Sequence, residues 1–385
     1  MGSFLNFVFL KDTHEFNGDS SFAMEGPIFH YIKKREYSYT LNGELKDGFC
    51  NILLIETNHK LESINHIPHS LYDFINTNNI KLLITSIPDP CNINTFNSAW
   101  EYINTKLPIE KFDIIDSNTR LSDKIYSLDW FLEEGVWNYE IYTQKEKNDL
   151  GYISEQIEKT EIYKFRNKKF LCFNRSVDKE HRISLFHEYL LNDYSDSYFT
   201  FLISVDGFAK VYFLDTYNYD KEYYNKHIPI ELDTHSVKDK TNFKTSNTNK
   251  KELFLDSCIN LVTETSFDEN ELFISEKIIK PIINYQPFIV FSAYGYLKKL
   301  KSYGFKTFSD IWDESYDDVV DSKERFFKLL ELIRDLNSKS IEELNEIYKK
   351  CIDICIYNKE HFHSLESDTL KNILIDIESK WKNKK

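Results

Sequence analysis

The sequence predicts an α/β protein made of two Rossmann-like domains followed by C-terminal helices. First, apolar runs of strand length alternate with amphipathic helical stretches, and a β-α-β order builds parallel sheets with right-handed crossovers. Second, this alternation is interrupted around residues 123–161 by a segment without clear periodicity. Third, the chain of 385 residues is long enough to form two hydrophobic cores.

The first domain is predicted to span residues 1–160. We interpret the apolar run within residues 1–10 as its first strand, because the run lacks the basic start and the small-residue cleavage site of a signal peptide. Further strands are expected at 28–32, 51–55, 82–87 and 112–115, and helices at 71–75 and 94–107. Ser70 is placed to cap the first of these helices. Residues 123–161 are interpreted as a connector between the domains.

The second domain is predicted to span residues 161–340. Its strands are expected at 170–173, 199–204, 211–214, 259–262 and 288–291, with a helix at 181–191. The polar segment 233–251 is interpreted as a loop. A further helix is expected to begin after Ser275, whose hydroxyl can cap it, and Pro281 is expected to kink that helix.

The last part of the chain, residues 341–385, is predicted to be helical. Ser340 and Glu343 have the spacing of a capping box at the start of one helix. A last helix has apolar residues at the spacing of a single buried face, at positions 370, 373, 374, 377 and 381. We interpret these helices as packing against a core.

Composition and charge exclude several classes of protein. The net charge is −14 at pH 7, and no long basic run occurs, so general binding to nucleic acid or to an anionic membrane is not expected. No apolar run approaches the length of a membrane span, so a soluble, cytoplasmic protein is expected. The six cysteines are expected to be reduced and mostly buried.

The stretch from residue 261 to residue 325 contains the main candidate site. Glu264 follows a predicted strand, and Ser275, Glu276, Lys277 and Lys280 lie at the start of the next predicted helix. Ligands of open parallel sheets bind at the carboxyl ends of the strands. A carboxylate can accept hydrogen bonds from both ribose hydroxyls, and a helix N-terminus with lysines can hold a diphosphate. The alternative is that Glu276 and Lys277 are ordinary first-turn residues on a solvated face.

A second candidate site follows the strand predicted at 170–173. Arg175 would lie at the same edge of the sheet, and Arg182 would lie in the first turns of the following helix. The planar guanidinium group suits bidentate contact with phosphate. The alternative for Arg182 is an ion pair with Glu180 or another nearby acid.

Several familiar motifs do not occur in the sequence. It contains no Asp-x-Asp, the motif that holds the metal ion in one large class of nucleotide-sugar enzymes, so no metal site is expected. It also contains no Gly-x-x-x-x-Gly-Lys, no Gly-x-Gly-x-x-Gly and no Gly-x-Ser-x-Gly, which argues against a kinase, a dehydrogenase and a hydrolase. No bound cofactor is therefore expected.

Six short motifs together resemble the donor-binding domain of GT-B glycosyltransferases, and in particular the fucosyltransferase-like enzymes of large viruses and phages. They are Thr-Glu-Thr at 263–265, Phe-Ile-Ser-Glu-Lys at 273–277, Lys-Pro-Ile at 280–282, Gln-Pro-Phe at 286–288, Gly-Phe-Lys-Thr-Phe at 304–308 and Asp-Glu-Ser-Tyr-Asp at 313–317. The resemblance covers roughly residues 169–325. It implies two domains that face each other across a cleft, with the C-terminal helices of residues 341–385 packed back on the first domain.

The resemblance also implies a function. It implies transfer of a sugar from a nucleotide-sugar, the co-substrate, to a hydroxyl of a glycan, a protein or another acceptor, with inversion and without a metal ion. The Glu276–Lys277 pair would bind the ribose and phosphates, and an arginine of the Asn-Arg…His-Arg segment would neutralise the leaving diphosphate. The catalytic base would come from the first domain, where Asp89 is the first candidate and Glu56 the second.

Two other functions stay open at this point. A glycosyltransferase of the phage type could act on modified DNA bases, although the acidic net charge disfavours this alternative. The chain could also be a non-catalytic module that binds a nucleotide or a glycan. The cytoplasm is the expected compartment, and this would be the host cytoplasm if the protein is viral.

Overall fold

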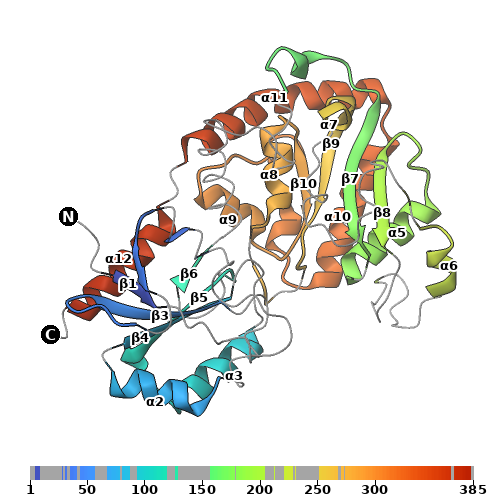
Figure 1. Cartoon of the computed structure of the whole chain (residues 1–385). Helices are drawn as coiled ribbons and strands as arrows, with labels where there is room; N and C mark the ends of the chain where they lie inside the picture. Colours follow the sequence, from blue (N-terminus) through green and yellow to red (C-terminus); the bar gives the residue numbers. More distant parts are fainter. Residues whose placement is uncertain are drawn as a thin grey trace. The chain divides into compact units, whose positions relative to one another are not determined.

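The structure, a computed structural model, describes residues 5–8, 28, 31–32, 35–40, 44–56, 67–78, 80–86, 93–118, 126–128, 157–177, 179–203, 212, 221–228, 230, 251–267, 270–272, 274–365 and 368–382. The chain forms two compact units, each with its own parallel sheet (Figure 1). Unit 1 comprises residues 1–133, 270–273 and 367–385, and unit 2 comprises residues 134–269 and 274–366. The α/β class and the parallel sheets predicted from the sequence are confirmed. The predicted domain limits at residues 160 and 340 stay predictions.

Unit 1 contains a six-stranded sheet in the order β2-β1-β3-β4-β5-β6, and every neighbouring pair is parallel. Its strands are β1 (Leu5–Val8), β2 (Ser38–Thr40), β3 (Cys50–Glu56), β4 (Ile80–Ser86), β5 (Phe112–Asp116) and β6 (Tyr126–Ser127). Its helices are α2 (His69–Thr77), α3 (Ile93–Asn104) and α12 (Thr369–Lys382), with the short 3₁₀ turn η3 (Ile109–Lys111) before β5.

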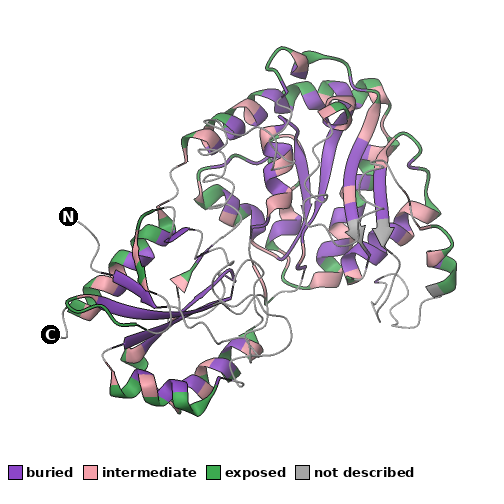
Figure 2. Cartoon of the chain, in the orientation of Figure 1, coloured by how far each residue is buried: buried purple, intermediate pink, exposed green. Residues whose placement is uncertain are grey.

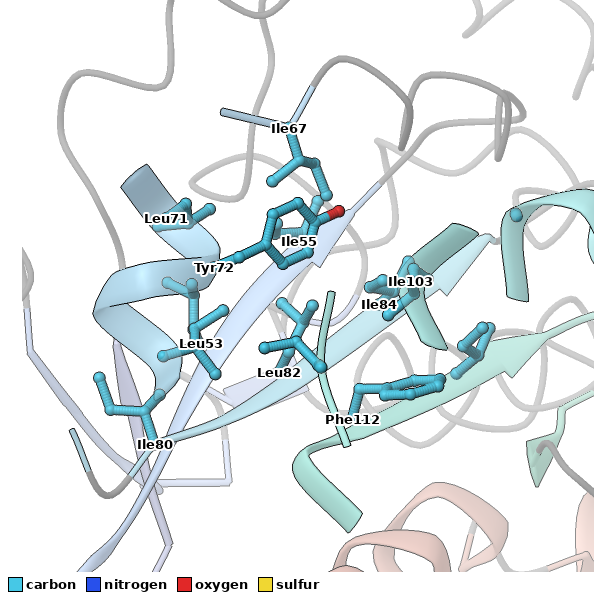
Figure 3. Packing of buried hydrophobic residues seen from close by; sticks show 14 of the residues in the cluster. Leu53, Ile55, Ile67, Leu71, Tyr72, Ile80, Leu82, Ile84, Ile103 and Phe112 are labelled. Carbon is cyan, nitrogen blue, oxygen red and sulfur yellow. The ribbon is translucent and has the colours of Figure 1, made fainter. Parts of the chain in front are cut away.

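One face of this sheet packs against α2 and α3 through aliphatic side chains (Figure 3). Alternate residues of β4, namely Ile80, Leu82 and Ile84, point to this face and are fully buried. Tyr72 and Ile103 cover them from the two helices. Burial of one such aliphatic side chain stabilises the fold by about 1.5–3 kcal/mol, so the alternating pattern fixes the strand register.

Unit 2 contains a four-stranded parallel sheet in the order β10-β9-β7-β8. Its strands are β7 (Lys168–Ser176), β8 (Tyr198–Ile203), β9 (Ser257–Thr263) and β10 (Phe288–Phe291). Its helical elements are η4 (Glu161–Tyr163), α5 (Glu180–Leu191), α6 (Lys221–Asn225), α7 (Lys251–Asp256), α8 (Glu276–Ile283), α9 (Tyr296–Ser302), η6 (Ser315–Asp318), α10 (Ser322–Ser338) and α11 (Ile341–Ser364). The described strand residues are mostly buried, and the helices expose their outer faces (Figure 2).

The strand order of unit 2 contains a topological switch point. The chain runs from β7 to β8 on one side of β7, and then continues with β9 and β10 on the other side. The connections that leave β7 and β9 therefore diverge, and a crevice is expected outside the carboxyl ends of these two strands. The residues that follow β7 and β9 are the ones that the sequence motifs single out.

Three local predictions for secondary structure are wrong. Residues 28–32 were expected to form a strand, but Ile28, Tyr31 and Ile32 are helical, and these three apolar positions do have the i, i+3, i+4 spacing of a helix. Ser70 does not cap α2, because the helix already begins at His69 and Pro68 is the N-cap residue. A strand was expected at 211–214, where the only described residue, Tyr212, is in a turn.

Other predictions concern the helices. Ser275 caps α8 as predicted, and Pro281 lies inside this helix, which ends two residues later at Ile283. The capping box at Ser340 and Glu343 is confirmed at the start of α11. The helix α7 was missed, because its first residue, Lys251, had been assigned to the predicted loop, whose other residues lie outside the described part of the chain. No helix of the described residues is long and apolar enough to cross a membrane.

Candidate functional site

The carboxyl ends of β7 and β9 are joined by a buried hydrogen bond. The Thr263 hydroxyl donates to the Asn174 side-chain oxygen over 2.6 Å, and both side chains are buried. The backbone N–H of Asn174 donates in turn to the hydroxyl of Thr200 on β8, over 3.0 Å. These bonds fix the relative positions of three strand ends at the switch point.

Glu264 directly follows β9, and its side chain is fully buried. One carboxylate oxygen accepts a hydrogen bond from the Tyr296 hydroxyl over 2.7 Å, and the other accepts from the Ser275 hydroxyl. Burial raises the pKa of Glu264, while Lys277 and the two hydroxyl donors act in the opposite direction. The Glu264 carboxylate thereby anchors the start of α8, and its predicted contact with a ligand stays a prediction.

The first turn of α8 brings together three polar side chains. The Ser275 hydroxyl accepts a hydrogen bond from the Lys277 backbone N–H over 3.2 Å. The Lys277 ammonium contacts the Glu276 carboxylate over 3.1 Å and the Thr265 hydroxyl over 3.2 Å. This places a cation, a carboxylate and a helix N-terminus at the carboxyl end of β9.

Glu276 and Lys277 are the partly accessible members of this group, and each side chain is 27% exposed. Burial alone would raise the pKa of Glu276, but the charges of Lys277 and Lys280 outweigh this effect and hold the pKa of the carboxyl below its ordinary value. The carboxylate is therefore ionised at neutral pH and can accept hydrogen bonds from a ligand.

Lys280 lies one turn further along α8. Its ammonium group is 5.9 Å from the centre of the Phe173 ring, on β7. Lys280 thus links α8 to the neighbouring strand at the switch point, and its charge acts on Glu276. The predicted rim of Glu276, Lys277 and Lys280 stays a prediction, and the described residues show that both lysine charges act on Glu276.

Arg182 and His181, in the first turn of α5, support the end of β9. The Arg182 guanidinium donates to the backbone oxygens of Thr263 and Glu264 over 3.2 and 3.0 Å. The His181 ring nitrogen Nε2 donates to the Glu264 backbone oxygen over 2.9 Å. Burial and the neighbouring Arg182 charge hold the pKa of His181 well below its ordinary value, so the ring is neutral. Arg182 was predicted to bind phosphate, but its described bonds hold a strand end.

The other predicted site residues are described only in part. Arg175 is the penultimate residue of β7, so its backbone lies at the switch point, while its side chain is outside the described part. Glu56 is the last residue of β3 in unit 1, and its side chain is likewise not described. Asp89 lies outside the described residues.

Unit 1 has its own polar edge at the end of β5. Asp116 is fully buried, and one of its carboxylate oxygens accepts the Asn118 backbone N–H over 2.6 Å. The Asn118 side chain pairs with a distant segment, donating to the Asn270 backbone oxygen over 2.9 Å and accepting from the Leu272 N–H over 3.2 Å. Residues 270–273 belong to unit 1, like Asn118.

The described residues contain no group of three or more His, Cys, Asp or Glu side chains that could hold a metal ion. The described cysteines are buried free thiols, at positions 50, 172, 258, 351 and 355. Burial raises the pKa of Cys172 and of Cys258 to about 12, so these thiols are not reactive at neutral pH.

Three solved structures are similar to this chain at low sequence identity. No protein-family model and no curated protein matches the sequence. A crystal structure of α1,3-fucosyltransferase with GDP is similar over 91% of this chain and 90% of that chain, with 10% identity and a TM-score of 0.36. A structure of α1,3-fucosyltransferase gives 11% identity, the same coverage and a TM-score of 0.36. A third, with GDP-fucose, gives 10% identity, 91% coverage of each chain and a TM-score of 0.37.

Two residues of the site were given no role from the sequence. Thr265 could have been noticed, because it follows the strand end by two positions and lies within the Thr-Glu-Thr motif. Tyr296 has no local signal, because it meets Glu264 across 32 positions of the chain. Only the three-dimensional structure brings Tyr296 to the site.

Proposed function

We propose that the protein is a glycosyltransferase that moves a sugar from a nucleotide-sugar donor to a hydroxyl of a glycan, a protein or another acceptor. The observation that carries the proposal is the ionised, partly accessible Glu276 beside Lys277 and Lys280, at the N-terminus of α8. This group lies at the carboxyl end of β9, next to the switch point of a parallel sheet. The motifs at residues 263–317 support the proposal through their resemblance to GT-B donor domains.

The chemistry of the group suits a nucleoside diphosphate. The Glu276 carboxylate can accept both hydroxyl hydrogens of a ribose. Lys277 and the positive end of α8 can face the diphosphate, whose negative charge grows as the glycosidic bond breaks. In this proposal Arg175 adds a second cation from β7, and Lys280 adds to the positive field. These cations stabilise the leaving group without a metal ion.

The acceptor side of the proposal is assigned to unit 1. A base must remove the proton of the acceptor hydroxyl during an inverting transfer. Asp89 and then Glu56 stay the candidates, since each follows or ends a strand of the parallel sheet in the sequence. With this base, the acceptor oxygen attacks the anomeric carbon as the nucleoside diphosphate leaves.

A binding experiment tests the proposal at Glu276. We expect isothermal titration with ADP, CDP, GDP and UDP to detect binding of at least one of them. Glu276→Gln should weaken that binding by roughly 10- to 150-fold, the effect of a lost charge-assisted hydrogen bond of about 1.5–3 kcal/mol. Glu324→Gln is the matched control, because Glu324 is an exposed acid in the first turn of α10.

Two outcomes would contradict the proposal. If the wild-type protein binds none of the four diphosphates, the site is not a donor site. If it binds one of them and Glu276→Gln binds equally well, Glu276 does not contact the nucleotide. Transfer or hydrolysis of the matching nucleotide-sugar then separates an enzyme from a non-catalytic binding module.

A further inference from the structure

We propose that Tyr296 is a positioning residue for the diphosphate of the donor, acting through Glu264 and Ser275 on Lys277. The inference rests on the function proposed above and adds a residue that no sequence motif assigns. Tyr296 is buried, with 1% of its surface exposed, so it cannot itself contact a ligand. Its effect on the ligand must pass through other side chains.

The chain of contacts starts at the Tyr296 hydroxyl and ends at the Lys277 ammonium. Tyr296 donates to one oxygen of the Glu264 carboxylate over 2.7 Å, and the Ser275 hydroxyl donates to the other oxygen. The Ser275 oxygen then accepts from the backbone N–H and from the ammonium of Lys277, over 3.2 and 3.3 Å. Each link is a hydrogen bond, and Tyr296, Glu264 and Ser275 are all buried.

The direction of the hydrogen bonds explains how Glu264 helps to position Lys277. A serine hydroxyl has one hydrogen, and in this site it is donated to Glu264. The lone pairs of the Ser275 oxygen are therefore free to accept from Lys277. A lysine side chain is flexible, and here three acceptors hold its ammonium: the Glu276 carboxylate over 3.1 Å, the Thr265 hydroxyl over 3.2 Å and the Ser275 hydroxyl over 3.3 Å.

Tyr296 is itself held firmly at the start of α9. The carboxylate of Asp317 accepts the backbone N–H groups of Leu297 and Lys298 over 2.9 and 3.0 Å. The backbone oxygen of Asp317 accepts the N–H of Gly295 over 2.7 Å. The first turn of α9 is therefore fixed, and the Tyr296 ring is preorganised to reach Glu264.

The substitution Tyr296→Phe tests the inference, because it removes one hydroxyl and keeps the ring. We expect it to weaken binding of the nucleoside diphosphate that the wild-type protein prefers by roughly 3- to 10-fold, the effect of one hydrogen bond. Binding of the parent nucleoside, which has no phosphate, should change less than about 2-fold by the same reasoning. A purely structural role would weaken both ligands equally.

A double substitution makes the test sharper. If Tyr296 acts through Lys277, then Tyr296→Phe should cause no further loss of diphosphate affinity in a Lys277→Met background. The matched control is Tyr194→Phe, since the Tyr194 hydroxyl also donates to a buried carboxylate, that of Glu188, over 3.1 Å. This control should lower the melting temperature and leave both affinities unchanged.

The possible results separate this inference from the proposed function. If the wild-type protein binds a diphosphate and Glu276→Gln weakens it, but Tyr296→Phe does not, only the role of Tyr296 is overturned. The role is also overturned if the loss persists fully in the Lys277→Met background, or if the nucleoside is affected equally. If the wild-type protein binds no diphosphate, the proposed function fails and this inference fails with it.

Discussion

At the residue scale, Gly304 shows how tightly the turn after α9 packs against α11. Its φ angle is +90°, a conformation that residues with a side chain rarely adopt. A Cβ atom at this position would lie 2.6 Å from His361 Nε2. The His361 ring cannot easily move away, because Nε2 is 2.6 Å from the Tyr303 backbone oxygen and the ring stacks on Tyr357.

Gly304→Ala should therefore destabilise the protein for two separate reasons. The left-handed conformation costs an alanine about 1–2 kcal/mol, and the steric overlap adds about 1–3 kcal/mol. Chemical denaturation measures the total loss in the free energy of unfolding. Gly295→Ala is the control, since Gly295 has a φ of +76° but no atom within 4 Å of the added Cβ. Equal losses of stability in the two variants would show that the overlap with His361 does not add to the cost of the Gly304 substitution.

The sequence indicated the position of some residues of the candidate site but not the partners of others. Glu276 and Lys277 could be placed because a capping serine directly precedes them. Glu264 and Arg182 were expected to contact a ligand, yet their described bonds go to buried hydroxyls and to backbone oxygens. A charged residue that serves the fold has the same local sequence as one that binds a ligand, so its partners must be seen in three dimensions.

At the element scale, the capping of α9 explains the motif at residues 313–317. The Asp-Glu-Ser-Tyr-Asp motif ends at Asp317, which caps α9 from a separate element, η6. The N-cap residue of α9, Gly295, has no side chain to do so. Glu314 of the same segment accepts the Phe308 backbone N–H over 2.7 Å. The motif thus stabilises the start of α9 and the loop that contains Phe308.

Asp317→Ala should destabilise the protein by about 1–2 kcal/mol, because it leaves two N–H groups of the first turn without their acceptor. Hydrogen exchange should become faster at Leu297 and Lys298 in particular. Asp318→Ala is the matched control, because Asp318 is the exposed neighbour. The capping role is wrong if the two variants lose equal stability, or if exchange in α9 does not change.

Helices and strands could be predicted from the sequence wherever it has one clear apolar face or one long apolar run. The buried strands β9 and β10 and the helix α11 with its capping box are examples. The segment around residues 28–32 was misread, because Ile, Phe and Tyr favour strands although the spacing of Ile28, Tyr31 and Ile32 fits a helix. In this segment, the spacing of the apolar residues indicates the structure better than their composition does.

At the scale of the whole molecule, unit 1 is assembled from three separate parts of the chain. The Asn118 side chain pairs with residues more than 150 positions away, and the Tyr126 hydroxyl bonds to Asp376, 250 positions away. Such pairings leave no periodic signal, so their residues could not be predicted from the sequence pattern, although the resemblance implied that the chain's C-terminal part packs on the first domain. The parallel order of the strands, in contrast, followed from the β-α-β alternation alone.

The last helix, α12, offers a direct test of this assembly. It is tied to β6 by Asp376 and by Lys380, whose ammonium is 2.7 Å from the Tyr126 hydroxyl. Its apolar face is buried, with Ile377 at 0% exposure, whereas Ile375 on the same helix is 52% exposed. The two isoleucines form a matched pair, since the same substitution at each changes the chemistry equally and the burial differently.

Ile377→Ala should destabilise unit 1 by about 2–5 kcal/mol, because it removes buried methyl groups and leaves a cavity. Ile375→Ala should cost at most about 0.5 kcal/mol, as expected for a surface position. Hydrogen exchange followed by mass spectrometry can assign the loss to a unit. We expect faster exchange in β4, β5 and β6 for Ile377→Ala, with β7 and β9 of unit 2 unchanged. If exchange rises equally in the strands of both units, α12 stabilises the whole chain and not unit 1 alone.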